Sequence, residues 1–453
     1  MVQRSAVTWL ACLVAVLCSS CLSATRENAV PATVRATALS SRLNTSMTAA
    51  SPYPLFTVFG YLPEYRQSLF NYEAFFKSGL THLIFFSAEV DPSTLRLTHV
   101  DDRLPSGDEW ARIRRLADLH GVKLMLCIGG GGRSAGFSNL VGDTVRRKAF
   151  IKEVNTVLLS RELDGIDFNW EYPQTAMEWW NFGRFLRELR SVLGFAASVG
   201  GEHATARIDA QRHRTRVRPA ILSMALHPHP SIAAVLQSAR LLHSLDYVHL
   251  MAYDHVVGTG PHSSVEYAAE VLGEETIGLF NEATYKRRLG HMHQQPSTEQ
   301  DHRRKLTLGI PFYGRHREDR RLQPETYDRL WFLIREWAGK SHPTWVEGGA
   351  ELRALSEYGG YSFTGYDDVK RKMRLARAAN LSGIMIWELG QDVPPGTSPM
   401  SLMTAVHEQL GDWGLWSDNE HHRSGNVRTA RADDSPQPLP QQSSSGMAEE
   451  GDL

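Results

Sequence analysis

The chain has 453 residues, 42% of them hydrophobic, which is enough for one large α/β domain with additional tails. Its formal net charge is -1, and lysines and arginines are interspersed with acidic residues, which excludes a basic surface for nucleic acid or for a membrane. An uncharged substrate fits this balance better than a charged one.

The first 24 residues have the features of a secretory signal peptide. Arg4 precedes an apolar run from Ala6 to Cys18, and small residues continue to Ala24. The run is too short to span a bilayer comfortably, and no later stretch of about 18 apolar residues exists. Three of the four cysteines lie in this segment, which leaves only Cys127 and therefore no intrachain disulfide. We expect a secreted, extracellular protein with no membrane partner.

Two polar segments flank the central part of the chain. Residues 25–52 are rich in Ala, Ser, Thr and Arg without a sustained apolar period, and residues 417–453 are polar with SPQPLPQQSSSG near the end. Both compositions are typical of disordered arms. The predicted folded domain is therefore residues 53–416.

Within this domain, eight short apolar runs alternate with amphipathic helical stretches. The runs are rich in Val, Ile, Leu and Phe, as parallel strands buried on both faces should be. The alternation predicts an α/β fold of the (β/α)8 TIM-barrel type, with a doubly wound open sheet as the alternative. Helices are predicted from Trp179 to Leu193 and from Asp367 to Ala379, where Asp367 or Asp368 can cap the start. The predicted strands are Phe56–Gly60, Thr81–Phe86, Lys123–Ile128, Gly165–Trp170, Ala220–Leu226, Tyr247–Ala252, Leu306–Ile310 and Gly383–Trp387.

The third run ends in four consecutive glycines, Gly129 to Gly132, where the lack of side chains would let a ligand approach the backbone. A phosphate cradle is the alternative, but neither GxGxxG nor a following Lys-Ser/Thr is present. Histidine pairs such as His227 and His229 have no third ligand at a suitable spacing. We therefore expect no metal and no cofactor.

The fourth run ends in a row of polar side chains within LDGIDFNWEY, residues 163–172. On a strand, Asp167, Asn169 and Glu171 project from one face, and the opposite face carries Ile166, Phe168 and Trp170. Buried charges need partners or a chemical role. Such a row at the C-terminal end of a barrel strand indicates a catalytic site. Asp164 has the opposite parity, so we expect it to bind backbone amides near the strand start.

These motifs resemble those of the chitinase family, glycoside hydrolase family 18, over roughly Phe56 to Val393. The DxxDxDxE signature of that family matches Asp164, Asp167, Asn169 and Glu171, and its SxGG signature matches Cys127, Gly129 and Gly130. Its MxYD motif matches Met251, Tyr253 and Asp254, while LGxPFYGR and GxMxWE occupy residues 308–315 and 383–388. Two positions depart from the family pattern. Cys127 replaces a serine, which we expect to be tolerated, and Asn169 replaces an aspartate, which we expect to slow turnover.

The resemblance implies a site and a mechanism. Glu171 would be the general acid and later the base, while the acetamido oxygen of the substrate serves as nucleophile. Tyr253 would orient that acetamido group, and Asp167 would support Asn169, whose amide could donate to Asp167 or to Glu171. The residues implied in substrate binding are Tyr61, Gly130, Tyr172, Met251, Asp254 and Trp387.

The implied activity is that of a secreted, monomeric endo-chitinase. Its partner would be chitin or another N-acetylglucosamine-containing polysaccharide, with no nucleic acid involved. The alternatives are an endo-β-N-acetylglucosaminidase acting on glycans or wall polymer, and a chitin-binding lectin with little turnover. Many relatives carry an α+β insertion after the seventh strand, but only about 50 residues separate Arg315 from Tyr366. We expect at most a reduced insertion and hence an open cleft.

Overall fold

The structure, a computed structural model, describes residues 56–194, 219–228, 235–236, 239–255, 257–273 and 302–416. All of these belong to one unit of the chain that ends at Trp416. The predicted signal peptide and both predicted arms lie outside the described residues. Within the described ranges, no helix combines the length and the apolar content that crossing a membrane requires.

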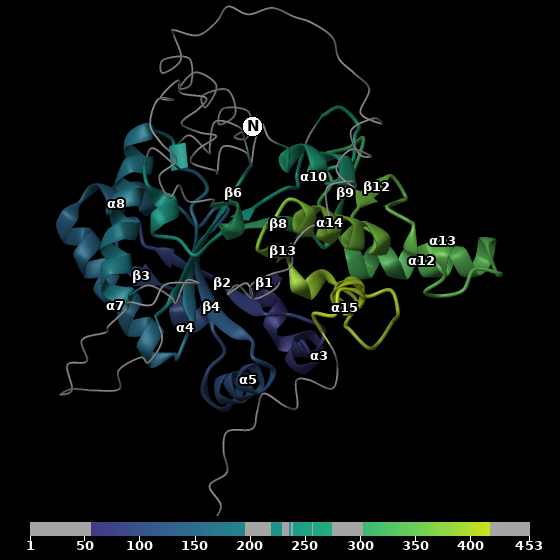
Figure 1. The fold of residues 1–453 in the computed structure, drawn as a ribbon, viewed down its shortest axis with the longest axis horizontal. Helices are drawn as coiled ribbons and strands as arrows, with labels where there is room; N and C mark the ends of the chain where they lie inside the picture. The colour runs from purple at the N-terminus through teal and green to yellow at the C-terminus, as the bar shows by residue number, and fades with distance from the viewer. Residues whose placement is uncertain are drawn as a thin grey trace, which may run out of the picture. The chain divides into compact units, whose positions relative to one another are not determined.

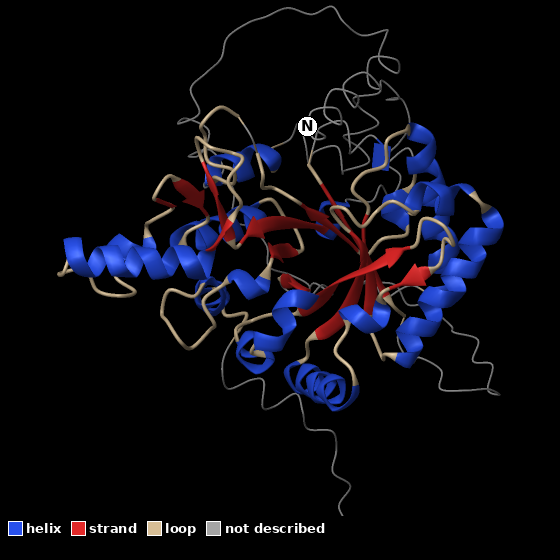
Figure 2. Cartoon of the chain, turned by 180° about the vertical axis from the view of Figure 1, so that it is seen from behind, coloured by secondary structure: helices blue, strands red, loops and turns tan. Residues whose placement is uncertain are grey.

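Eight parallel strands form a closed barrel, which confirms the predicted fold class. The hydrogen-bonded order is β1-β13-β8-β7-β6-β5-β4-β2, and pairing of β1 with β2 closes the ring. Figure 2 shows these strands at the centre with helices around them. The barrel strands are β1 (Thr57–Pro63), β2 (His82–Val90), β4 (Lys123–Gly129), β5 (Gly165–Asn169), β6 (Ile221–Leu226), β7 (Tyr247–Leu250), β8 (Leu306–Pro311) and β13 (Gly383–Trp387).

Helices follow the strands on the outside of the barrel (Figure 1). The described α-helices outside the insertion between β8 and β13 are α3 (Tyr72–Lys77), α4 (Val100–Arg103), α5 (Gly107–His120), α6 (Phe137–Gly142), α7 (Thr144–Ser160), α8 (Ala176–Leu193), α10 (Val265–Val271), α14 (Tyr366–Ala378) and α15 (Leu402–Asp412). Short 3-10 helices are η2 (Glu64–Leu69), η3 (Leu241–His243), η5 (His302–Lys305) and η6 (Leu389–Gln391). A two-residue strand, β3 (Leu97–Thr98), pairs antiparallel with β2.

The two faces of β5 divide as the alternating pattern predicts. Phe168 faces outward, and its ring centroid lies 5.3 Å from that of Phe185 on α8. Trp170, just beyond the strand, lies 5.5 Å from Phe182 of the same helix. The polar residues of the row therefore face the barrel interior because the aromatic residues between them are packed under α8.

Helix α8 begins with a capping box shortly after the polar row Asp167, Asn169 and Glu171. Glu178 N–H donates to Thr175 Oγ1 at 3.2 Å, and Thr175 N–H donates to Glu178 Oε2 at 2.9 Å. The cap predicted for α14 was wrong. Gly365 is the N-cap residue and no side chain caps that helix, because both aspartates already lie in its first turn.

An insertion stands between β8 and β13, the seventh and eighth barrel strands. It holds a four-stranded antiparallel sheet in the order β10-β9-β12-β11, together with two helices. Its elements are β9 (Tyr313–His316), β10 (Glu325–Thr326), α12 (Tyr327–Ser341), α13 (Ala350–Arg353), β11 (Glu357–Tyr358) and β12 (Tyr361–Phe363). The insertion is small, as expected from the length of the intervening sequence.

Candidate active site

Asp167 is a fully buried carboxylate held by side chains of two other strands. Tyr61 of β1 donates its hydroxyl to Oδ2 at 2.7 Å, and Ser223 of β6 donates to Oδ1 at 2.7 Å. Burial raises the pKa of Asp167 above its usual value, although hydrogen bonds from Ser223, Tyr61 and Cys127 oppose that rise. The side chain is thus fixed in place beneath the site.

Asn169 and Glu171 contact each other directly. Asn169 Nδ2 donates to Glu171 Oε1 at 3.0 Å. Of the two acceptors expected for the Asn169 amide, Glu171 is the one it binds, while Asp167 accepts from Tyr61 and Ser223. The side chain of Asn169 is buried, and its Oδ1 has no hydrogen-bond partner. A buried acceptor without a partner is costly, so this oxygen is available to a donor on a ligand.

The pKa of Glu171 is raised above its usual value. Burial is the main cause, and the negative charge of Asp254 adds to it. Hydrogen bonds from Asn169, from the Tyr172 side chain and from the Gly131 backbone act in the opposite direction. A carboxyl group of this kind suits a general acid.

Ser134 ties the backbone of Glu171 to the glycine-rich loop. Its Oγ accepts from Glu171 N–H at 3.1 Å and lies 3.0 Å from Gly130 O and 3.2 Å from Asn169 O. Gly130 N–H also donates to Asn169 O at 2.6 Å. The loop after β4 and the end of β5 are thus joined by several hydrogen bonds.

Two of the four glycines are required by packing of the protein itself. A Cβ at Gly130 would lie 2.2 Å from the Phe86 ring, and a Cβ at Gly129 would lie 2.5 Å from Asn169 O. Both residues have positive φ, +116° and +100°. At these two positions packing within the protein is by itself a sufficient reason for glycine. At Gly131 the space is open, and that residue is exposed.

Asp254 follows β7 and is held by residues of the insertion and of its own loop. Arg315 of β9 binds both of its oxygens, at 2.5 and 2.8 Å, and the Tyr313 hydroxyl donates to Oδ1 at 2.7 Å. His262 Nδ1 lies 3.4 Å from Oδ1. Burial alone would raise the pKa of Asp254, but His262 and Arg315 lower it well below its usual value. Asp254 is consequently an anion at every working pH.

Aromatic rings line the barrel interior beneath the polar row. The Trp387 ring, at the end of β13, lies 5.4 Å from the Tyr61 ring and 4.7 Å from the Phe86 ring. Tyr253 and Met251, from the end of β7, belong to the same buried cluster. Tyr172, by contrast, is 41% exposed and follows Glu171 directly. The predicted substrate-binding residues therefore gather at one end of the barrel.

Glu388, directly after Trp387, is a buried carboxyl group whose role the sequence did not indicate. Its Oε1 lies 3.2 Å from Arg66 Nε of η2, and its Oε2 accepts from Gly390 N–H at 2.8 Å. Burial raises the pKa of Glu388 to about 7. The ion pair joins the segment after β13 to the segment after β1, the strand that carries Tyr61.

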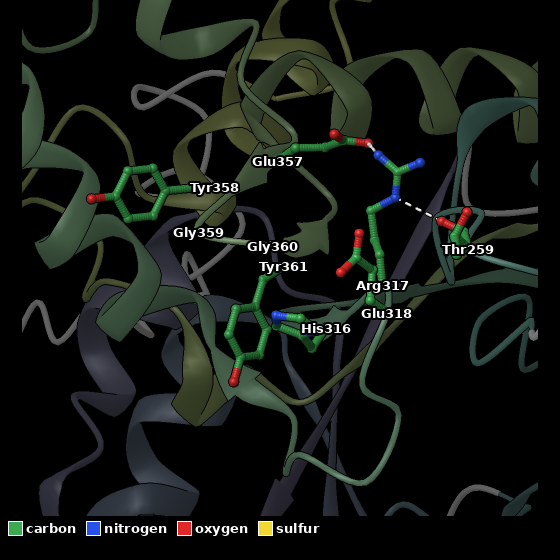
Figure 3. Close-up of a pocket in the computed structure, with 9 residues that line it drawn as sticks. All are labelled: Thr259, His316, Arg317, Glu318, Glu357, Tyr358, Gly359, Gly360 and Tyr361. Carbon is green, nitrogen blue, oxygen red and sulfur yellow. Dashed lines mark hydrogen bonds and ion pairs between the residues drawn. The ribbon is translucent and has the colours of Figure 1, made fainter.

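The insertion carries a separate polar pocket of about 490 Å³, shown in Figure 3. Arg317 crosses it, donating to Thr259 O at 2.7 Å and to Glu357 Oε1 at 2.6 Å. The His316 and Tyr361 rings form part of its wall. None of the predicted site residues lines this pocket, so it is distinct from the candidate active site.

Several residues that build the site were not singled out from the sequence. They come from segments far in sequence from the polar row Asp167, Asn169 and Glu171, and they are Ser223, Ser134, Phe86, His262 and Arg66. The sequence did point to Arg315, which is the last residue of the LGxPFYGR motif. The motif does not indicate that Asp254 is its partner. Among the described residues, no group of three His, Cys, Asp or Glu side chains could hold a metal ion.

Comparison with known families fits this geometry. The sequence model of "Glycosyl hydrolases family 18" matches residues 57–392, which spans the whole barrel. The chain belongs to this family. A family 18 relative, the class V chitinase of Arabidopsis thaliana, is 25% identical over 335 residues, covering 70% of this chain and 82% of the relative. Family 18 members of this kind are mostly chitinases, and chitinase-like chemistry is the activity that this membership supports.

Solved structures of family 18 proteins share the fold. The GH18 chitinase ChiB from the chitin utilization locus of Flavobacterium johnsoniae has a TM-score of 0.55 and 23% identity, covering 80% of this chain and 96% of that protein. A mutant class V chitinase from Nicotiana tobaccum, solved in complex with NAG4, has a TM-score of 0.54 and 19% identity, covering 79% of this chain and 99% of that protein. Both structures therefore share the fold of this chain, and the Nicotiana tobaccum protein was solved with NAG4 bound.

Proposed function

We propose that this chain is a secreted endo-chitinase that hydrolyses β-1,4 links between N-acetylglucosamine units with retention of configuration. The observation that carries the proposal is the pair formed by Asn169 and Glu171. A carboxyl group with a raised pKa stands beside a buried amide whose Oδ1 has no partner. That arrangement offers a proton donor for a glycosidic oxygen and an acceptor for an acetamido N–H.

The reaction divides into two steps. In the first, the bond between the anomeric carbon and the leaving oxygen breaks as Glu171 gives its proton to that oxygen. The acetamido oxygen of the same sugar forms the new bond to the anomeric carbon, which yields an oxazolinium ion. In the second step, water attacks the anomeric carbon from the opposite side and gives a proton back to Glu171, so the acetamido group is regenerated.

The other site residues orient the substrate for this attack. Tyr253 would hold the acetamido carbonyl in line with the anomeric carbon. This orientation lowers the entropic part of the activation barrier for the attack. Trp387, fixed by Tyr61 and Phe86, would support the apolar face of the reacting sugar. Asp254 and Tyr172 would bind sugar hydroxyls.

Secretion and a monomeric state are part of this proposal. Secretion rests on the sequence of the first 24 residues, and internal cutting rests on the small size of the insertion. Secretion is tested by looking for the protein in the culture medium, and the monomeric state is tested by measuring the size of the purified protein. A product series that contains only disaccharide from the first minutes would argue for exo action.

The direct test uses two substrates. The protein is incubated with chitin oligomers and, separately, with a biantennary N-glycan, and the products are identified by mass. Shorter chitin oligomers support the proposal. Cleavage of the N-glycan alone would identify an endo-β-N-acetylglucosaminidase, which shares the same catalytic row.

A lectin is the second candidate, and one observation favours it. Residue 169 is a neutral amide, so the site lacks a second carboxylate next to Glu171. Without that charge, a cationic oxazolinium ion is stabilised less, and binding without turnover becomes the competing outcome. Binding of chitin oligomers with no product after long incubation would decide for the lectin.

A further inference from the structure

Gly131 differs from the other three glycines of its loop. Gly129, Gly130 and Gly132 have φ values of +100°, +116° and +76°, which favour glycine. Gly131 has no positive φ, and a Cβ there would meet only Glu171 Oε2, at 3.6 Å, an ordinary van der Waals distance. The backbone therefore tolerates a side chain at 131, and glycine leaves exposed space beside the acid.

The exposed space lies next to Glu171 Oε2, the carboxyl oxygen that does not accept from Asn169 Nδ2. Oε1 already accepts from Asn169 Nδ2, so protonation at Oε2 disturbs no contact with that amide. Oε2 is the atom nearest to the position of a Cβ at 131. A glycosidic oxygen that received the proton from Oε2 would lie beside Gly131, and its departing sugar would then face the exposed space there.

The loop that forms this space is firmly held. Arg133 N–H donates to Gly130 O at 2.9 Å, and the Arg133 guanidinium pairs with Glu64 Oε1 at 2.8 Å and lies over the Phe86 ring at 5.2 Å. On the other side, Ser134 joins the loop to Glu171. The loop is thus anchored on both sides of Gly131, so the exposed space beside this residue is a fixed feature of the fold.

We propose that Gly131 sets the specificity for the leaving group, and that the exposed space over it accepts leaving groups bulkier than an unsubstituted N-acetylglucosamine unit. A sugar that carries an ether- or amide-linked side chain belongs to this class. The inference rests on the proposed role of Glu171 as proton donor. A side chain at 131 would fill the space. It would exclude a bulky leaving group but still admit a small one.

The test compares two aryl chitobiosides whose phenols have the same pKa but differ in bulk near the ether oxygen. For the wild type, we expect kcat/KM for the bulky glycoside to lie within about threefold of that for the small one. Gly131→Leu should raise the small-to-bulky ratio by at least about tenfold. Gly339→Leu is the matched control, since Gly339 is exposed on α12 with nothing within 4 Å of a Cβ, and it should leave the ratio unchanged.

A binding measurement separates this inference from the proposed function. The affinities of both glycosides are measured for Glu171→Gln with Gly131 present and with Gly131→Leu added. We expect the second change to weaken binding of the bulky glycoside selectively. A wild type that hydrolyses neither compound contradicts the proposed function, and the affinity pair then decides this inference. The inference is overturned if Gly131→Leu changes neither the small-to-bulky ratio of kcat/KM nor the relative affinities of the two glycosides.

Discussion

Asn169 Nδ2 donates a hydrogen bond to Glu171 Oε1 at 3.0 Å, so a neutral amide stabilises the ionised form of the group proposed as proton donor. This bond lowers the pKa of Glu171 against the larger rise caused by burial. A general acid works only while it is protonated, and activity is lost as the pH rises through its pKa. The amide therefore moves the alkaline limb of the activity profile to lower pH.

We expect Asn169→Asp to raise turnover and to move the pH optimum upward. A carboxylate at 169 repels ionised Glu171 and raises its pKa, and it stabilises a neighbouring cationic intermediate by up to a few kcal/mol. The measurement is kcat against pH for both proteins on a chitin oligomer. Lower activity in the variant would show that the site is built around the amide.

Asn169→Leu is the control for that substitution. It removes the donor to Glu171 without adding charge, so the alkaline limb should move upward while turnover does not increase. A gain in turnover equal to that of Asn169→Asp would show that charge at 169 is unimportant.

Glu171→Gln should lower hydrolysis by at least about 100-fold while binding of chitin oligomers survives. Glutamine keeps the size and the hydrogen-bonding capacity of the side chain but has no transferable proton. Turnover is followed by release of reducing ends, and binding is followed by calorimetry. Unchanged turnover in this variant is incompatible with the proposed mechanism.

Fresh products should appear first as the β-anomer. The acetamido oxygen attacks from the face opposite the leaving oxygen, and water then attacks from the other side, so two inversions give retention. NMR of an early digest reads the anomer directly. A dominant α-anomer at early times, or cleavage of a substrate whose 2-acetamido group is replaced by hydroxyl, would contradict the oxazolinium route.

Ser134→Ala should lower kcat by about 10- to 100-fold with little change in KM. The substitution removes the acceptor for Glu171 N–H and the bridge to Gly130 O, so the acid is no longer held in place. Ser134→Thr keeps the hydroxyl and should restore most of the lost kcat. Equal losses in both variants would show that Ser134 contributes only to packing.

Glu388 should make the protein less stable as the pH rises from about 5 to about 8. Its pKa is raised from 4.5 to about 7 in the folded state, so between these values the folded protein binds more protons than the unfolded chain. The free energy of unfolding therefore falls as pH rises through this window. Asp392, whose pKa burial also raises to about 7, contributes with the same sign.

Urea denaturation of wild type and Glu388→Gln across this range isolates the contribution of Glu388. Glutamine cannot ionise, so the variant should show a smaller loss of stability between about pH 5 and about pH 8. The slope that remains belongs to Asp392 and other groups. Identical slopes in the two proteins would mean that Glu388 is neutralised by Arg66 in the folded state.

The sequence determined the barrel strands and the shared face of Asp167, Asn169 and Glu171 because both depend on local periodicity. All eight predicted strands form, since each is a short apolar run that suits a strand buried on both faces. The alternation around Asn169 likewise fixed which side chains share a face. Asp164, of opposite parity, accepts from Leu124 N–H at 2.9 Å and pairs with Arg114 at 2.8 Å, which confirms its predicted structural role.

Only the tertiary structure decided which groups meet. Tyr61 and Asp167 are 106 residues apart, and Asp254 and Arg315 are 61 residues apart, yet each pair is hydrogen-bonded. Residue spacing predicts which face of a strand a side chain occupies but not the neighbours that barrel closure brings to it. The sequence therefore left both Asp167 and Glu171 open as acceptors for Asn169 and did not indicate Tyr61 or Ser223 as partners of Asp167. The environment of Glu171 and the open space over Gly131 arise in the same way, because burial and free volume are properties of packed segments and are absent from any one segment alone.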